Sequence, residues 1–172
     1  MADRAMVEDL PLHVAGLRRY ALALTGSRFE AEDLVQDTLT RAVAAAASFR
    51  RGGNLRSWLF TIMHNAFVSS VRARRAADRE LDDALPELSQ APTQLERLEG
   101  RDVLAALGRL PEAQRAALVL IAVEEFSYSE AARVLGVPLG TVMSRLARGR
   151  EALRRAMSDD APPQLHVVGG RR

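Results

Sequence analysis

Apolar residues recur along the chain at spacings of three and four, which is the period of an amphipathic helix. In the first half of the sequence, this pattern predicts helices at about residues 12–24, 27–46 and 55–75. Gly26 ends the first helix, and Ser27 with Glu30 forms a capping-box pattern that begins the second. Turn-forming residues 50–54 precede the third helix, which Asn54 can cap.

The second half resumes the helical pattern after an interruption. Residues 78–92 contain several acids and two prolines with little apolar periodicity, so we expect a flexible acidic linker there. The helices predicted beyond it cover about residues 93–107, 111–125, 128–135 and 138–155. The tail at 159–172 contains a Pro-Pro and a Gly-Gly pair and is expected to be disordered.

The predicted fold is all-α, with two small helical domains at residues 1–77 and 93–158 joined by the linker. The composition agrees, because 48% of the residues are hydrophobic but only 5% are aromatic, which favours a small aliphatic core. The chain has no cysteine, which excludes disulfides and thiolate metal sites and suits the cytoplasm. No apolar run predicts a signal peptide or membrane insertion.

Charge is unevenly distributed, although the net charge is only +2. Residues 78–100 contain seven acidic residues and two arginines, and every basic residue of the chain is arginine. Arginine suits phosphate and base-edge contacts because its fork donates two parallel hydrogen bonds. A genome biased toward arginine codons explains the missing lysines equally well, so the count alone assigns no function.

The last two predicted helices have the pattern of a helix-turn-helix. Gly136 stops the short first helix, Val137 is an apolar plug in the turn, and Pro138 begins the second helix. One side of the second helix is apolar and contains Val142, Leu146, Gly149 and Leu153. The other side contains Thr141, Ser144, Arg145 and Arg148. Such a side fits the major groove of duplex DNA, while a solvated polar face is the alternative interpretation.

Two helices of the first half also have a chemically distinct side. Opposite its apolar side, helix 27–46 carries Asp33, Gln36, Asp37 and Arg41. On the residues alone, this is a solvated face with an Asp37–Arg41 ion pair. Between two apolar stripes, helix 55–75 carries Trp58, Thr61, Asn65 and Arg72. Aromatic, amide and guanidinium groups can hold unstacked bases, but a core position for Trp58 fits equally well.

Three stretches of the chain carry a family resemblance. Residues 128–146 resemble the C-terminal DNA-reading region of bacterial sigma factors, and the extracytoplasmic-function type in particular. Residues 31–42 and 49–62 look like the second conserved region of the same family, in the expected order. The resemblance spans about residues 12–157, with one departure at Met143, where relatives often carry lysine.

The resemblance implies a dissociable specificity subunit of bacterial RNA polymerase. Its expected partners are core RNA polymerase (the coiled coil of the largest subunit and the flap of the second-largest), promoter DNA as duplex and as melted strand, and an anti-sigma factor. For the minus-thirty-five element it implies contacts by Thr141, Ser144, Arg145 and Arg148. For the minus-ten element it implies Arg50, Asn54, Leu55, Trp58, Thr61, Asn65 and Arg72. For polymerase binding it implies Asp33, Gln36, Asp37 and Arg41.

No catalytic constellation competes with this interpretation. His13, His64 and His166 are scattered without metal-ligand spacing, so we expect no metal, cofactor, small-molecule substrate or enzymatic activity. Two alternatives remain, a stand-alone helix-turn-helix regulator and a sigma-like decoy that sequesters an anti-sigma factor. A decoy predicts loss of arginines on the reading helix, whereas Arg145 and Arg148 are present.

Overall fold

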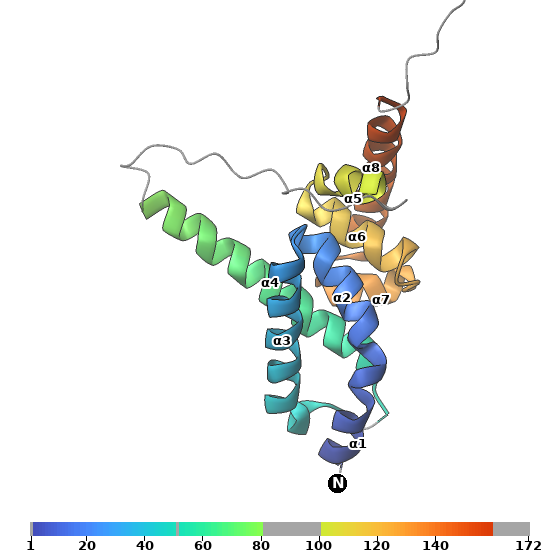
Figure 1. Ribbon diagram of the computed structural model, residues 1–172. Coiled ribbons are helices and arrows are strands. Elements are labelled where there is room, and N and C mark those ends of the chain that lie inside the picture. The colour runs from blue at the N-terminus through green and yellow to red at the C-terminus, as the bar shows by residue number, and fades with distance from the viewer. Residues whose placement is uncertain (1, 51, 81–100, 160–172) are drawn as a thin grey trace, which may run out of the picture.

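The computed structural model describes residues 2–50, 52–80 and 101–159, and every element within them is helical (Figure 1). The first half contains α1 (Ala2–Asp9), α2 (Pro11–Thr25), α3 (Arg28–Ala44), the 3-10 helix η1 (Ala46–Ser48) and α4 (Leu55–Glu80). The second half contains α5 (Arg101–Gly108), α6 (Glu112–Ala122), α7 (Tyr128–Leu135) and α8 (Leu139–Asp159). The prediction of an all-α fold is confirmed.

In the first half, α2, α3 and α4 pack around a shared core. Both apolar stripes of α4 face inward, so that Leu59, Phe60 and Met63 are fully buried. Thr38 lies on the apolar side of α3 and is also buried, because its hydroxyl donates to the Leu34 carbonyl oxygen at 2.7 Å. Both apolar stripes predicted for α4 therefore contribute to the core.

Three boundaries of the first half differ from the prediction. Helix α1 was not predicted, and Met6 on it is buried. Helix α3 ends at Ala44, before η1. Helix α4 continues to Glu80 because no glycine or proline follows Asn54 until Pro86. The linker prediction was thus wrong for residues 78–80. Its remainder, the predicted helix start at residue 93 and the tail beyond residue 159 lie outside the described residues.

The helix-turn-helix forms from α7 and α8 as predicted. The Ser127 hydroxyl accepts from the Glu130 amide at 3.3 Å, and the Glu130 carboxylate accepts from the Ser127 amide at 2.9 Å, completing the capping box. Gly136 ends α7 with a φ of 61°, a left-handed conformation that glycine adopts without steric cost. Helix α6 ends earlier than predicted, and Glu125 in the following turn has a φ of 54°.

The two halves pack directly against each other. Figure 1 shows α6 and α7 beside α2 and α4, and contacts join α2 to α6 and α4 to α7. One cluster of buried residues includes members from both halves. Within it, the rings of Phe60 and Phe126 meet edge to face with centroids 5.0 Å apart. We call residues 2–80 the N-terminal block, residues 101–159 the C-terminal block, and this docked arrangement the closed chain. The exact domain bounds, 1–77 and 93–158, stay a prediction.

Candidate nucleic-acid interface

Helix α8 carries the reading face, which consists of Thr141, Ser144, Arg145 and Arg148. Val142 and Leu146, on the opposite side, are buried as predicted. Gly149 lies against α6, where an added Cβ would come within 3.1 Å of a Leu118 methyl group. Ser144 and Arg148 are exposed, and Thr141 is partly exposed. The packing of α8 therefore turns hydroxyl and guanidinium groups outward, as groove recognition requires.

One member of the reading face lies close to the N-terminal block. Arg145 is partly buried, and its charge contributes to a lowered pKa of His64 on α4. Burial is the larger cause, and the two together lower the pKa of His64 to about 4. His64 Nδ1 is also 3.1 Å from the Tyr20 hydroxyl. In the closed chain, Arg145 is therefore less available to DNA than Arg148.

Helix α4 carries the strip predicted for the minus-ten element, which consists of Trp58, Thr61, Asn65 and Arg72. Trp58 packs against Phe49 with ring centroids 5.1 Å apart and is only partly buried. The Thr61 hydroxyl donates to the Ser57 carbonyl oxygen at 2.8 Å. Asn65 and Arg72 are exposed. The sequence left open whether Trp58 is a core residue or is accessible to a base. In the structure it packs against the core and is also partly exposed to solvent.

The remaining minus-ten candidates precede and begin α4. Asn54 caps the helix, because its side-chain oxygen accepts from the Ser57 amide at 3.0 Å. Its amide nitrogen donates to Glu130 of α7 at 3.3 Å. Arg50 is exposed and Leu55 is partly buried. The closed chain therefore places Asn54 against the C-terminal block.

Helix α3 carries the face predicted to bind polymerase. All of its members, Asp33, Gln36, Asp37 and Arg41, are exposed. Arg41 Nε donates to both carboxylate oxygens of Asp37 at 2.9 Å, which raises the pKa of Arg41. Asp33 and Asp37 also line a groove of about 300 Å³ between α3 and α4, together with Phe67 and Arg74. An acidic rim beside a partly apolar groove is suited to a basic protein partner.

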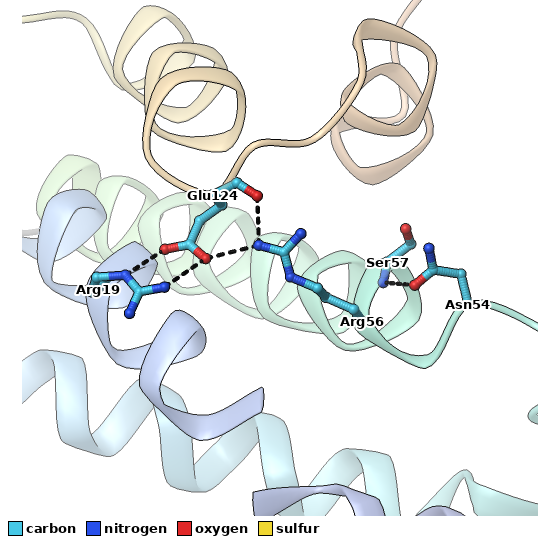
Figure 2. Close-up of polar contacts among 5 residues, drawn as sticks. All are labelled: Arg19, Asn54, Arg56, Ser57 and Glu124. Atoms are coloured by element: carbon cyan, nitrogen blue, oxygen red, sulfur yellow. Dashed lines mark hydrogen bonds and ion pairs between the residues drawn. The ribbon is translucent and has the colours of Figure 1, made fainter. Parts of the chain in front are cut away.

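A buried carboxylate joins the two blocks, as Figure 2 shows. The Glu124 side chain is 0% exposed and accepts from Arg19 Nε at 2.8 Å and from Arg56 Nη2 at 3.0 Å. Arg56 also donates to the Glu124 backbone carbonyl oxygen, and its guanidinium lies 4.2 Å from the centroid of the Phe126 ring. The hydrogen bond from Arg19 to Glu124 raises the pKa of Arg19.

Sequence reasoning missed these three residues. Arg19 and Arg56 are 105 and 68 positions from Glu124, so no local spacing connects them. The available signal was an acidic residue directly after the apolar run that ends α6, since a charge there must be solvated or paired. That signal predicts a partner without identifying it.

Two further findings concern the described part of the chain. No helix in it is both long and apolar enough to cross a membrane. Within the same residues, no three His, Cys, Asp or Glu side chains are grouped so that they could hold a metal ion.

Comparison with known proteins assigns each block to a described family. Residues 10–64 match the family described as the sigma2 domain of PhyR, and residues 100–153 match the one described as sigma-70, region 4. Over 150 residues the chain is 43% identical to the ECF RNA polymerase sigma factor EcfG of Rhodopseudomonas palustris. That alignment covers 85% of this chain and 81% of that protein.

Solved structures give the same result. The chain is similar to the sigma factor RpoE in its complex with the anti-sigma factor NepR from Bartonella quintana, with a TM-score of 0.76 and 39% identity. The match covers 89% of this chain and 96% of that one. It is also similar to the structure of CnrH in complex with the cytosolic domain of CnrY, with a TM-score of 0.68 and 30% identity. That match covers 92% of this chain and 90% of that one.

Proposed function

The chain belongs to the extracytoplasmic-function sigma factors of bacterial RNA polymerase, and we propose that its two blocks recognise two separate promoter elements. As a sigma factor, it binds core RNA polymerase and directs transcription initiation. The observation that carries the proposal is the order of the two family matches, sigma2 followed by region 4, on two folded blocks.

The C-terminal block is proposed to bind the minus-thirty-five element as duplex. The hydroxyls of Thr141 and Ser144 lie near the start of α8, where a recognition helix meets base edges. Arg145 and Arg148 lie one turn further along, in reach of base edges or phosphates. Met143 is 51% exposed beside them, and because its side chain cannot donate a hydrogen bond, we propose no phosphate contact at this position.

The N-terminal block is proposed to capture the melted minus-ten element. Residues 50–55 would hold a flipped base, with Asn54 and Asn65 contacting base edges. Trp58 offers an aromatic face, and Arg72 is placed to contact the strand backbone. Leu55 and Thr61 complete this set.

The other partners follow from the acidic face of α3 and from the family. Asp33, Gln36, Asp37 and Arg41 are proposed to dock on the coiled coil of the largest polymerase subunit, and the C-terminal block on the flap of the second-largest subunit. An anti-sigma factor is proposed as regulator, since a matched sigma factor is in complex with one. The cytoplasm is the proposed compartment because the polymerase is there. We assign no catalytic step to this chain, because phosphodiester synthesis belongs to the polymerase.

Reconstitution with core RNA polymerase tests the proposal. The purified chain is added to core enzyme and genomic DNA fragments, and transcript starts are mapped. We expect starts that depend on the chain and share two upstream elements. Core enzyme binding without promoter-dependent starts would contradict the proposal and favour the decoy. Duplex binding without core enzyme binding would favour a stand-alone regulator.

The role of the reading face is tested with two matched arginines of α8. Arg148→Ala should weaken binding to the upstream element and lower the salt slope of log K by about 0.9, the value expected for one lost duplex phosphate contact. Arg150→Ala removes an exposed arginine that the sequence does not place on the reading face, and it should have a smaller effect. Equal effects of both changes would exclude a specific role for Arg148.

A further inference from the structure

The Glu124 side chain is fully enclosed, yet both arginines that hold it belong to the other block. Arg19 on α2 and Arg56 on α4 remain 56% and 35% exposed, whereas Glu124 is 0% exposed. Block docking therefore inserts a carboxylate between two arginines of the N-terminal block (Figure 2). Moving the C-terminal block away would leave two guanidinium groups facing the same space without this acceptor.

The donors around Glu124 have the geometry of an oxyanion site. Arg19 donates from Nε and Nη2 to different carboxylate oxygens, at 2.8 and 3.1 Å. Arg56 Nη2 adds a third donor at 3.0 Å. An arginine fork binds phosphate as well as carboxylate. A backbone phosphodiester offers two acceptor oxygens and one negative charge, as Glu124 does.

The arginine pair lies beside the residues to which the proposed function assigns the melted strand. Arg56 falls between Asn54 and Trp58 at the start of α4. In the closed chain, the Asn54 amide donates to Glu130 of α7, in the same contact between the blocks. The same movement of the C-terminal block would release Asn54 and the arginine pair together.

We infer that Arg19 and Arg56 form a binding site for a backbone phosphate of the melted promoter strand, and that Glu124 occupies this site in the closed chain. The inference rests on the proposed function and adds a ligand site to it. Because one carboxylate fills the site, block docking and strand binding at these arginines exclude each other. The chain therefore binds single strands fully only after the blocks separate.

Gly16 provides a second way to disturb the closed chain. A Cβ at this position of α2 would lie 2.8 Å from Glu124 Oε2 and 3.4 Å from the Phe60 ring. The Glu124 carboxylate cannot move away from this Cβ without losing hydrogen bonds, because Arg19 and Arg56 hold it in place. Gly16→Ala should therefore weaken docking while leaving every charge in place.

The experiment measures binding of the full chain to short labelled single-stranded DNA of mixed sequence, by fluorescence anisotropy over a range of salt. We expect Glu124→Gln to raise the affinity at least about fivefold, the lower end of ordinary coupling between sites. It should also steepen the salt slope of log K by about 0.7, the value expected for one added phosphate contact on a single strand. Adding Arg19→Ala and Arg56→Ala to Glu124→Gln should remove both gains.

Three controls separate this site from general charge effects. Arg18→Ala removes a neighbouring arginine that pairs with Glu32 at 2.9 Å on the outside, and it should leave the gain intact. Gly16→Ala should produce a gain that also depends on the two arginines. Inorganic phosphate should compete no better than chloride at equal ionic strength. Strong competition by inorganic phosphate would indicate that free phosphate, and not the DNA backbone, is the ligand of this site. That result would overturn the inference.

Opening is followed separately by energy transfer between dyes at Ala47→Cys and Ala113→Cys, two exposed positions in a chain without cysteine. An opened variant that gains no affinity, or whose gain survives loss of both arginines, would overturn the inference. If the variants do not fold alone, the inference is tested by the salt dependence of promoter binding by the chain in complex with core polymerase. There, Arg19→Ala with Arg56→Ala must lower the salt slope more than Arg18→Ala. Mixed-sequence binding needs no polymerase, so failure of the transcription assay would count against the proposed function alone.

Discussion

Two carboxylates of this protein form ion pairs of nearly equal length in opposite surroundings. Asp37 accepts from Arg41 at 2.9 Å on the exposed side of α3, where the two side chains are 46% and 56% exposed. Glu124 accepts from Arg19 at 2.8 Å but is 0% exposed. Distance alone would rate the two pairs as equal. The two pairs differ in the solvent exposure of the carboxylate, and this difference determines how each pair responds when its partner is removed.

The exposed pair can exchange its partner at little cost. Water and salt screen the attraction between Asp37 and Arg41, so a polymerase surface can replace either contact. The buried pair cannot do so, because Glu124 separated from its arginines must be hydrated or matched by another cation. The first arrangement suits a docking surface, whereas the second couples two blocks of the chain.

Charge reversal on the exposed side should have the largest effect on binding and almost none on folding. Asp37→Arg should weaken association with core polymerase about a hundredfold or more, since like charges that meet in an interface cost several kcal/mol. Association is measured by titrating labelled chain with core enzyme. The urea midpoint should fall only slightly, because the lost i, i+4 pair is exposed and contributes a few tenths of a kcal/mol.

The swapped pair, Asp37→Arg with Arg41→Asp, is the matched control. It retains the ion pair within α3 but places the negative charge one turn away. We expect binding to stay weak. Recovery of normal binding would mean that the helix needs only an intact pair, and the docking role of Asp37 would then be lost.

Removal of the buried carboxylate should have the opposite result, with a large effect on the stability of the closed chain. Glu124→Ala should destabilise the closed chain by about 2–3 kcal/mol, because charged hydrogen bonds are lost while the arginines regain only part of their hydration. Energy transfer between the blocks and urea unfolding report the change. A loss as small as that caused by Asp37→Ala would show that burial does not distinguish the two pairs.

The difference between these pairs also explains what the sequence could predict. The helices follow from apolar spacing and local caps, so both sides of α3 and α8 were predicted. Asp37 and Arg41 are neighbours on one helix, and their pair was predicted from an i, i+4 spacing. These features depend on residues within a few positions of each other.

The docking of the two blocks does not have this local origin. It depends on the fit of Glu124 between two arginines of distant helices and on the missing Cβ of Gly16. Gly16 lies inside a helix, where sequence patterns give glycine no positive role. The electrostatic effect of Arg145 on His64 was likewise not predictable, because the two residues are distant in the sequence and lie in different blocks. Candidate residues were thus predicted, but not their accessibility.

A partly buried basic group, His64, extends the comparison. Burial and Arg145 lower the pKa of His64 to about 4, from 6.5 in an unfolded chain. As the pH falls below 6.5, His64 becomes protonated in the unfolded chain, whereas in the folded chain it stays neutral until about pH 4. Stability from this group is therefore present above pH 6.5 and is lost on acidification, by about 2 kcal/mol at pH 5.

Urea unfolding at pH 8 and pH 5 tests this expectation on wild type and His64→Gln. The stability difference between the two proteins should shift by about 2 kcal/mol between these pH values. His13→Gln is the matched comparison, because burial and Arg56 also lower the pKa of His13. If the stability difference between wild type and His64→Gln does not vary with pH, the His64 ring is hydrated in the folded chain.

The smallest expected effect concerns the residue that follows the buried carboxylate. Glu125 has a φ of 54°, which costs a residue with a Cβ about 1 kcal/mol, whereas glycine adopts it freely. Glu125→Gly should therefore stabilise the chain by up to about 1 kcal/mol, less the greater entropy of glycine in the unfolded state. The gain should appear in the urea midpoint with an unchanged m-value. Glu125→Ala removes the same carboxylate but keeps the Cβ, so it should bring no gain. Equal midpoints for the two variants would show that the backbone at residue 125 is held without strain, and the positive φ of Glu125 would then have no measurable cost to stability.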